Sequence, residues 1–235
     1  MTRSLFGGAQ RRSFPGVDPA PRAGDPANTV SGADSVTTVR LLLVAYPGAG
    51  KGTQAAKLAV HYGIEHLSSG ALLRAEVTRG TRIGRVAADY VSRGDLVPDD
   101  LVFAMLATPV LEAARTGGYV LDGFPRTLRQ AEVAYSIAEE IKEIELQAVV
   151  HLRVSRGELL QRLQARGGRP GRADDSEITI THRFEVFETQ TEPLLGFYAR
   201  RGILLDIDGE QSVGDVFKDI TSAVDRLRIS TAPKE

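Results

Sequence analysis

The stretch Ala45-Tyr46-Pro47-Gly48-Ala49-Gly50-Lys51-Gly52-Thr53-Gln54 is the most informative part of this chain for its fold. It follows the apolar run 39–44, which is typical of a buried strand, and leads into the run 54–59, which favours a helix. A strand, a glycine-rich turn and a helix in this order are the context of a phosphate-binding loop. Backbone N–H groups and the helix dipole would hold the phosphate oxygens there. The sequence therefore predicts a phosphate site at Gly48, Ala49, Gly50, Lys51, Gly52 and Thr53.

The composition sets limits on the function. The chain has 235 residues, of which 42% are hydrophobic and 25% charged, and its net charge is −1. This balance gives no overall field that would favour nucleic acid or a membrane surface, and no apolar run reaches the length of a membrane span. The chain contains no cysteine, which excludes disulfides, zinc sites built from thiolates and cysteine nucleophiles. We therefore expect no nucleic-acid partner, no membrane contact and no zinc.

Residues 1–38 differ from the rest, because they are rich in glycine, proline, alanine and serine and have no apolar periodicity. We expect a disordered extension or a start codon assigned upstream of the true one. Two targeting alternatives stay open. Arg11 and Arg12 partly match a twin-arginine export signal, although no apolar segment follows them, and the early arginines partly match a transit peptide. We expect a cytoplasmic protein, or one of the mitochondrial matrix if the extension is a transit peptide.

Strands and helices alternate from residue 39 onward. Strands are expected at 39–44, within 63–70, and at 119–121, 147–152 and 203–205, and helices at 54–59, 71–79, 82–93, 100–114, 128–141, 155–166, 176–200 and 213–227. We expect Asp99 to cap the helix 100–114, Ser155 to cap the helix 155–166, and Pro193 to kink or split the helix 176–200. Residues 229–235 are expected to form a disordered tail.

This alternation predicts an α/β fold with a parallel sheet that is covered by helices on both faces. Ligand sites of such sheets lie at the carboxyl ends of the strands. The phosphate loop, Asp122 and Gly209 each follow or end an expected strand. We therefore expect these three features on the same edge of the sheet.

Five motifs occur in the order seen in adenylate kinases: 47–54, 67–70, 94–99, 122–127 and 171–175. Over about residues 39–228 the chain resembles the short-lid form of that family. The resemblance implies a P-loop NTPase-type core, a helical lobe for the nucleoside monophosphate at about 69–97 and a lid at about 167–175. It also implies a monomer that, with Mg²⁺, transfers the γ-phosphoryl group of ATP to AMP and reversibly forms two ADP.

The resemblance also assigns roles to residues. It implies five catalytic residues, Lys51, Arg126, Arg166, Arg172 and Arg183. For ATP, it implies that Arg162 lies over the adenine, that the loop with Gln211 contacts the same adenine, and that Arg166 reaches the phosphates. AMP contacts are implied for Arg74 and Arg126 at the phosphate, for Gln130 at the adenine edge, and for Ser69, Asp95, Leu96, Val97, Gly123, Phe124, Pro125, Arg172 and Arg183. We expect Asp122 to bind Mg²⁺ only through water.

The chemistry of the reaction suits these residue types. Phosphoryl transfer spreads negative charge over the moving group, so catalysis consists mostly of positioning and charge stabilisation. Arginine suits this task because its planar fork can hold two oxygens at once. No general base is needed, since the AMP phosphate is already an anionic nucleophile. We expect the four histidines of the chain to be structural or exposed.

Two other functions stay open from the sequence. One is a UMP/CMP kinase or a relaxed nucleoside-monophosphate kinase, because Ser69 stands where adenylate kinases commonly have threonine. The other is a nucleotide sensor without turnover, for which Ala45 and Ala71 speak, since the family usually has glycine and aspartate at these positions. The arginine set favours an enzyme over a sensor. A GTPase is disfavoured, because the chain lacks an Asn-Lys-x-Asp motif.

We predict that deletion of residues 1–35 leaves the activity intact, because this segment has no apolar pattern that would pack on the folded part. Turnover and soluble yield of the truncated and full-length proteins provide the measurement. Loss of soluble, active protein would show that the extension contributes to the fold.

Overall fold

The structure is a computed structural model that describes residues 38–166 and 177–231, all within a unit that spans residues 36–235. The extension predicted for 1–38 and the lid predicted for 167–175 thus lie outside the described residues, except for Thr38. The predicted tail 229–235 is described only up to Thr231, and this part continues the last helix.

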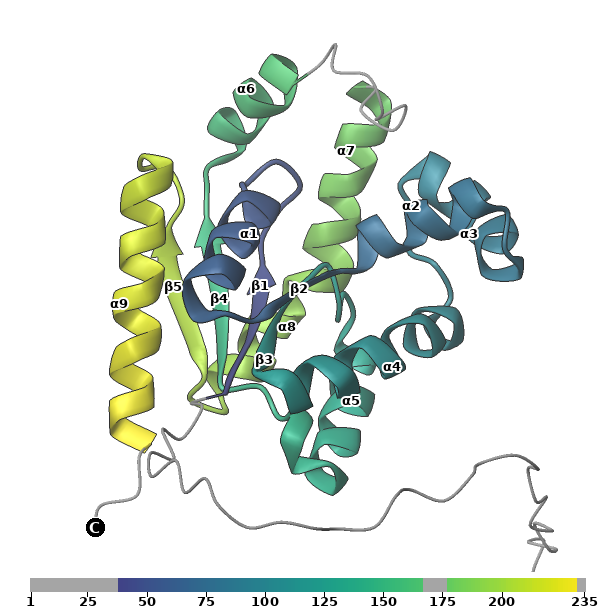
Figure 1. The fold of residues 1–235 in the computed structure, drawn as a ribbon. Coiled ribbons are helices and arrows are strands. Elements are labelled where there is room, and N and C mark those ends of the chain that lie inside the picture. The colour runs from purple at the N-terminus through teal and green to yellow at the C-terminus, as the bar shows by residue number, and fades with distance from the viewer. Residues whose placement is uncertain (1–37, 167–176, 232–235) are drawn as a thin grey trace, which may run out of the picture. The chain divides into compact units, whose positions relative to one another are not determined.

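A five-stranded parallel sheet forms the centre, with the strand order β2-β3-β1-β4-β5 (Figure 1). Its strands are β1 (Val39–Val44), β2 (Glu65–Ser68), β3 (Gly118–Asp122), β4 (Ala148–Arg153) and β5 (Leu204–Asp208). Most residues of the central strands β1, β3 and β4 are apolar and buried, which is typical of strands covered on both faces. The predicted α/β class with a parallel sheet is confirmed.

Helices cover both faces of this sheet, because the side chains of β1 alternate between two cores. Leu41 and Leu43 belong to the core under α1 (Lys51–Tyr62) and α9 (Val213–Thr231). Leu42 and Val44 belong to the opposite core, to which α4 (Asp99–Thr116), α5 (Leu128–Glu140) and α8 (Pro193–Ala199) contribute. The two cores hold the phosphate loop at the carboxyl end of β1.

A helix pair, α2 (Ser69–Arg79) and α3 (Arg82–Arg93), extends away from the sheet (Figure 1). It has a small core of its own with α4, formed by Leu73, Ala87, Val97, Val102, Leu106 and Phe124. This pair occupies the range 69–97, for which we predict the monophosphate-binding lobe. Gly84 lies where the two helices meet, since a Cβ built on it would stand 2.0 Å from the carbonyl oxygen of Glu76.

Two helix boundaries test the sequence predictions. The expected long helix is split at Pro193, as predicted: α7 (Glu177–Val186) passes into a π-helical turn (Phe187–Thr191), and Pro193 begins α8. The expected cap at Asp99 is wrong, because Pro98 is the N-cap and Asp99 is the first residue of α4. The carboxylate of Asp99 is instead engaged by a side chain of α5.

The remaining elements lie close to their predicted positions. The helix α6 (Arg156–Arg166) follows Ser155, whose Oγ accepts from the backbone N–H of Glu158 at 3.5 Å, so the predicted cap is confirmed. A short 3₁₀ turn (Lys142–Ile144) precedes β4. Among the described helices, none combines the length and the apolar character that crossing a membrane requires.

We predict that Gly84→Ala destabilises the fold, because its Cβ would meet backbone atoms of α2 that cannot move aside as a side chain can. Overpacking of this kind costs about 1–3 kcal/mol or more of unfolding free energy. Chemical denaturation of the purified variant provides the measurement.

Gly157→Ala is the matched control, since Gly157 also lies in a helix and a Cβ there would meet no atom within 4 Å. It should be neutral or slightly stabilising, because alanine has the higher helix propensity. Equal stability of the two variants would contradict the proposed packing of α2 on α3.

Candidate functional site

A cavity of about 720 Å³, which we call the main cavity, opens at the carboxyl ends of the strands. Its volume lies in the range of ligand sites. Twelve of the predicted site residues line it: Gly48, Gly50, Lys51, Gly52, Thr53, Arg74, Leu96, Asp122, Gly123, Pro125, Arg126 and Arg183. These residues come from the phosphate loop, α2, the loops after α3 and β3, and α7. The fold thus joins the phosphate loop to a second cluster of cationic side chains.

The phosphate loop has the backbone that its glycines permit. Gly48 and Gly50 have φ angles of 92° and 96°, a region that other residues rarely adopt. Gly48 also packs closely on α6, because a Cβ there would lie 2.9 Å from Cγ of Leu163. Ala49 is buried and does not line the main cavity. Gly50 precedes the first residue of α1, so the helix N-terminus faces the cavity.

The first two residues of the loop, Ala45 and Tyr46, pack into the core. Ala45 is 4% exposed, and the ring of Tyr46 lies 4.0 Å from that of Phe187 and 5.7 Å from that of Phe184. The backbone carbonyls of Ala45 and Tyr46 accept hydrogen bonds from Nζ of Lys51 at 2.6 and 3.0 Å. The loop therefore closes around the ammonium of Lys51 although Ala45 stands where the family usually has glycine.

Four cationic side chains line the main cavity, and we call Lys51, Arg74, Arg126 and Arg183 the cationic cluster. Burial lowers the pKa of Arg126, and the nearby charges of Arg183 and Arg74 lower it further, while Asp122 opposes them. Asp122 is the one carboxylate among the residues that line this cavity. The excess of positive charge makes the cavity a site for an anion with several oxygens.

Asp122 ends β3 and lies opposite Ser68 of β2 and Leu43 of β1. Burial raises the pKa of its carboxyl, but its interaction with His66 and the charges of Lys51 and Arg126 lower it, and the net pKa is below its ordinary value. Asp122 is therefore ionised at neutral pH despite a side chain that is only 15% exposed. It partly balances the cationic cluster and keeps a negative charge beside the phosphate loop.

His66 is a residue of the main cavity that the sequence prediction missed. Its Nε2 lies 3.9 Å from Oδ2 of Asp122 and has no hydrogen-bond partner among the described residues. The expectation that the histidines are structural or exposed did not anticipate that His66 lines the main cavity beside Asp122. The alternation along β2 could have indicated it, because His66 and Ser68 lie on the same face of a strand that ends at the site.

A smaller cavity of about 70 Å³, the side cavity, lies next to the main cavity and shares the three arginines of the cationic cluster. Five predicted AMP contacts that do not line the main cavity line this one, namely Ser69, Asp95, Val97, Phe124 and Gln130, and Leu96 and Gly123 line both. Ser69 is 2% exposed, and its hydroxyl donates to the carbonyl of Gly123 at 2.6 Å. Leu73, Val97 and Val102 make part of this cavity apolar.

The loop after α3 is attached to α7 by polar contacts. Asp95 lies 2.7 Å from Nε2 of His182 and 2.9 Å from Nε of Arg93. The contact with Arg93, followed by that with His182, holds the pKa of Asp95 below its ordinary value. Gly94 packs against Arg183, since a Cβ there would stand 2.8 Å from its Cγ. These contacts bring Arg183 to both cavities.

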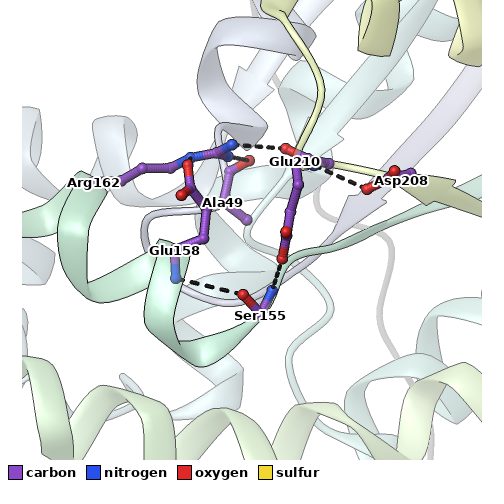
Figure 2. A network of polar contacts seen from close by, with 7 residues as sticks. Ala49, Ser155, Glu158, Arg162, Asp208 and Glu210 are labelled. Carbon is purple, nitrogen blue, oxygen red and sulfur yellow. Dashed lines mark hydrogen bonds and ion pairs between the residues drawn. The ribbon is translucent and has the colours of Figure 1, made fainter.

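Arg162 lies outside both cavities and joins three segments (Figure 2). Its guanidinium donates to Glu158 on its own helix at 2.7 Å, to the carbonyl of Gly209 at 2.9 Å and to that of Ala49 at 3.5 Å. On the other side of the same network, Glu210 accepts from the backbone N–H of Ser155 at 2.6 Å. Arg162 thus connects α6 and the loop after β5 to the phosphate loop.

The structure does not bring every predicted residue to a cavity. Gln211 lines neither cavity, and its amide donates to Asp219 at 2.8 Å and to the carbonyl of Asp208 at 3.3 Å. Arg166 is the last residue of α6, and its side chain lies outside the described part of the structure. Arg172 also lies outside the described residues. The roles predicted for these three residues remain predictions.

Comparisons with known proteins agree with this geometry. A family model described as "Adenylate kinase" matches residues 43–203. The curated adenylate kinase of Nitrobacter winogradskyi is 43% identical over 194 residues, which cover 80% of this chain and 94% of that protein. That of Synechococcus sp. is 44% identical over 185 residues, or 79% and 98% of the two chains. That of Phocaeicola vulgatus is 38% identical over 189 residues, or 80% and 100%.

We predict that Asp122 makes the stability of the protein fall at acid pH. The pKa of its carboxyl is lower in the folded protein than the unfolded value of about 3.9, so its contribution is complete above that pH and is lost as the pH falls toward the folded pKa. The free energy of unfolding of the wild type should therefore approach that of Asp122→Asn below about pH 4. Denaturant titrations between pH 7 and pH 3 provide the measurement.

Asp100→Asn, which removes an exposed carboxylate outside both cavities, controls for the loss of one negative charge. A difference between wild type and Asp122→Asn that stays constant over this pH range would contradict the prediction.

Proposed function

The chain belongs to the adenylate kinase family, and on that premise we propose how its own residues transfer the γ-phosphoryl group of ATP to AMP. As an adenylate kinase, the protein catalyses this transfer reversibly, with two ADP as the product. Nothing in the relatives or in the fold favours the UMP/CMP kinase or the nucleotide sensor. The observation that carries the residue assignments is the main cavity, in which a phosphate loop and a separate group of arginines face one space.

The donor phosphates bind at the phosphate loop in this proposal. The N-terminus of α1 and the backbone of Gly48, Gly50 and Gly52 supply N–H groups, and Lys51 and Thr53 line the same wall of the cavity. The family resemblance places the ATP adenine at Arg162 and at the loop with Gln211. The network around Arg162 supports this, because it connects that loop to the carbonyl of Ala49 (Figure 2).

The acceptor occupies the side cavity and the adjoining part of the main cavity. Arg74 and Arg126 line both cavities, which suits a phosphate that must lie near the base pocket and also near the donor. The side cavity offers apolar walls for a base and the amide of Gln130 for its polar edge. We assign AMP to this place, with Ser69, Leu96, Val97 and Phe124 around it.

The chemical step depends on charge. The mutual repulsion within the cationic cluster is relieved when phosphate oxygens enter, and it is relieved most where negative charge develops during transfer. Arg126 and Arg183 line both cavities and thus stand between the two nucleotides. By family resemblance Arg166 and Arg172 join them from the lid side. No residue has to remove a proton, because the attacking phosphate is already an anion.

The residues at the end of β3 fit a hydrated magnesium ion. Within the described ranges no three acidic, histidine or cysteine side chains gather to form a cage for a metal. Asp122 supplies one ionised carboxylate beside the phosphate loop, and Nε2 of His66, which has no hydrogen-bond partner among the described residues, lies 3.9 Å from it. This suits Mg²⁺, which usually keeps several of its waters. When bound, the ion would neutralise part of the charge on the ATP phosphates, with Asp122 and Thr53 beside it.

We also propose that the protein acts as a monomer in the cytoplasm. The monomer and the cytoplasmic location are what the family resemblance implies, and this chain supplies the phosphate loop, the arginines and the base pocket that the proposed reaction uses. The measurement that tests the acceptor assignment is the formation of ADP from ATP with AMP, UMP, CMP and GMP compared side by side. AMP as a poor acceptor would contradict the proposal.

We predict that Arg126→Ala lowers turnover by roughly 10²-fold or more, because the variant loses a charged fork at the phosphoryl acceptor. Arg126→Lys should recover only part of this loss, since an ammonium cannot hold two oxygens in the geometry of a guanidinium. Steady-state rates with ATP and AMP provide the measurement, together with a thermal melt that checks the fold.

Arg115→Ala is the matched control, because Arg115 is an exposed arginine of α4 outside both cavities. Its activity should equal that of the wild type. Near-normal turnover of a folded Arg126→Ala variant would remove Arg126 from the proposed mechanism.

A further inference from the structure

Gln130 is held at both ends of its side-chain amide. Its Oε1 accepts from the backbone N–H of Arg126 at 2.8 Å, and its Nε2 donates to Oδ1 of Asp99 at 2.7 Å. Gln130 is only 2% exposed, and it lines the side cavity. The amide therefore belongs at once to the base pocket and to a fixed hydrogen-bond network.

Only one orientation of the amide satisfies both partners. The backbone N–H of Arg126 can only donate, and an ionised Asp99 can only accept. A rotation of the amide by half a turn would place its NH₂ group against the N–H of Arg126 and its oxygen against the carboxylate of Asp99. Both contacts would then be repulsive, so the network fixes which atom of Gln130 is the donor and which the acceptor.

Helix capping explains just one of these two bonds. Thr127 is the N-cap of α5 and accepts from the backbone N–H of Gln130 at 3.1 Å, which makes Gln130 the third residue of the helix. In a capping box the side chain at this position turns back toward the start of the helix, as Oε1 does here. The bond to Asp99 comes from α4, 31 positions away in the sequence, and has no part in the cap.

The fixed amide can distinguish the two purines. Each of its polar atoms keeps one further bonding position, a lone pair on Oε1 and an N–H on Nε2. Adenine presents a donor at N6 and an acceptor at N1, whereas guanine presents an acceptor at O6 and a donor at N1. The two edges are complementary to opposite orientations of the amide, so a glutamine that could rotate freely would accept either base.

We propose that Asp99 is a positioning residue that fixes the amide of Gln130 in the orientation that reads adenine and thereby rejects guanine. This inference rests on the proposed binding of AMP in the side cavity. Asp99 does not line that cavity, so it acts through Gln130 and not by contact with the base. The selectivity of the acceptor site for AMP over GMP thus depends on a residue of α4 outside the site.

The test compares kcat/KM for AMP and for GMP, at saturating ATP, in the wild type and in Asp99→Ala. We expect the ratio of AMP to GMP to fall about tenfold or more in the variant, because one of the two contacts that oppose rotation of the amide is lost and only the backbone N–H of Arg126 still favours the native orientation. The change should come from a higher KM for AMP and a gain with GMP, with kcat for AMP and KM for ATP nearly unchanged. If Asp99 had a purely structural role, the variant would lower kcat/KM for AMP and for GMP by the same factor, and their ratio would not change.

Three further variants sharpen the test. Asp99→Asn should keep the ratio within about threefold, since its amide oxygen can still accept from Nε2 of Gln130. Asp100→Ala, which removes the exposed neighbouring carboxylate from the same helix turn, should leave the ratio unchanged. In a Gln130→Ala background, Asp99→Ala should have no further effect on the ratio, because a residue that acts through Gln130 has nothing left to position.

An unchanged ratio in folded Asp99→Ala would overturn the inference while leaving the proposed function intact. If Asp99→Ala does not fold, Asp99→Asn provides the test. A tenfold fall of the AMP to GMP ratio in this variant would overturn the inference, because the Asn oxygen can still accept from Nε2 of Gln130. A wild-type enzyme that does not use AMP would overturn the proposed function and this inference with it.

Discussion

The accumulation of positive charge in one cavity is the constraint on which the site depends. Lys51, Arg74, Arg126 and Arg183 come from α1, α2, the loop after β3, and α7, and one carboxylate stands among them. Burial lowers the pKa of Arg126, and the charges of Arg183 and Arg74 lower it further, so the charged form of this side chain is disfavoured in this cavity. The rest of the fold must therefore hold these elements together, and anions that enter the cavity would offset the positive charge.

The sheet and its two cores provide this support. The parallel register sets Asp122 beside β1 and β2, so that its ionised carboxylate offsets part of the positive charge where the phosphate loop begins. The carbonyls of Ala45 and Tyr46 hold the ammonium of Lys51, and the ring of Tyr46 packs on Phe187. The contact of Asp95 with His182 connects the loop after α3 to the helix that carries Arg183. Each of these contacts positions a charge as well as stabilising the fold.

The base pocket has a different physical basis, since its selectivity depends on the direction of hydrogen bonds. A buried glutamine amide distinguishes donors from acceptors only if its own orientation is fixed. In this chain the backbone of Arg126 and the carboxylate of Asp99 supply the two opposite partners. The same glutamine also follows the N-cap of α5, so the start of that helix and the reading of the base rely on one side chain.

The sequence by itself determined the α/β class, the phosphate loop, the break at Pro193 and the family, because glycine and proline constrain the backbone locally and the motifs follow one another in a fixed order. Only the tertiary structure showed that Asp99 binds Gln130, that His66 faces Asp122, and that Gln211 points away from the cavities. These contacts join residues far apart in the chain or on different elements. Local propensity carries no information about them, because the packing of the helices on the sheet decides which side chains meet.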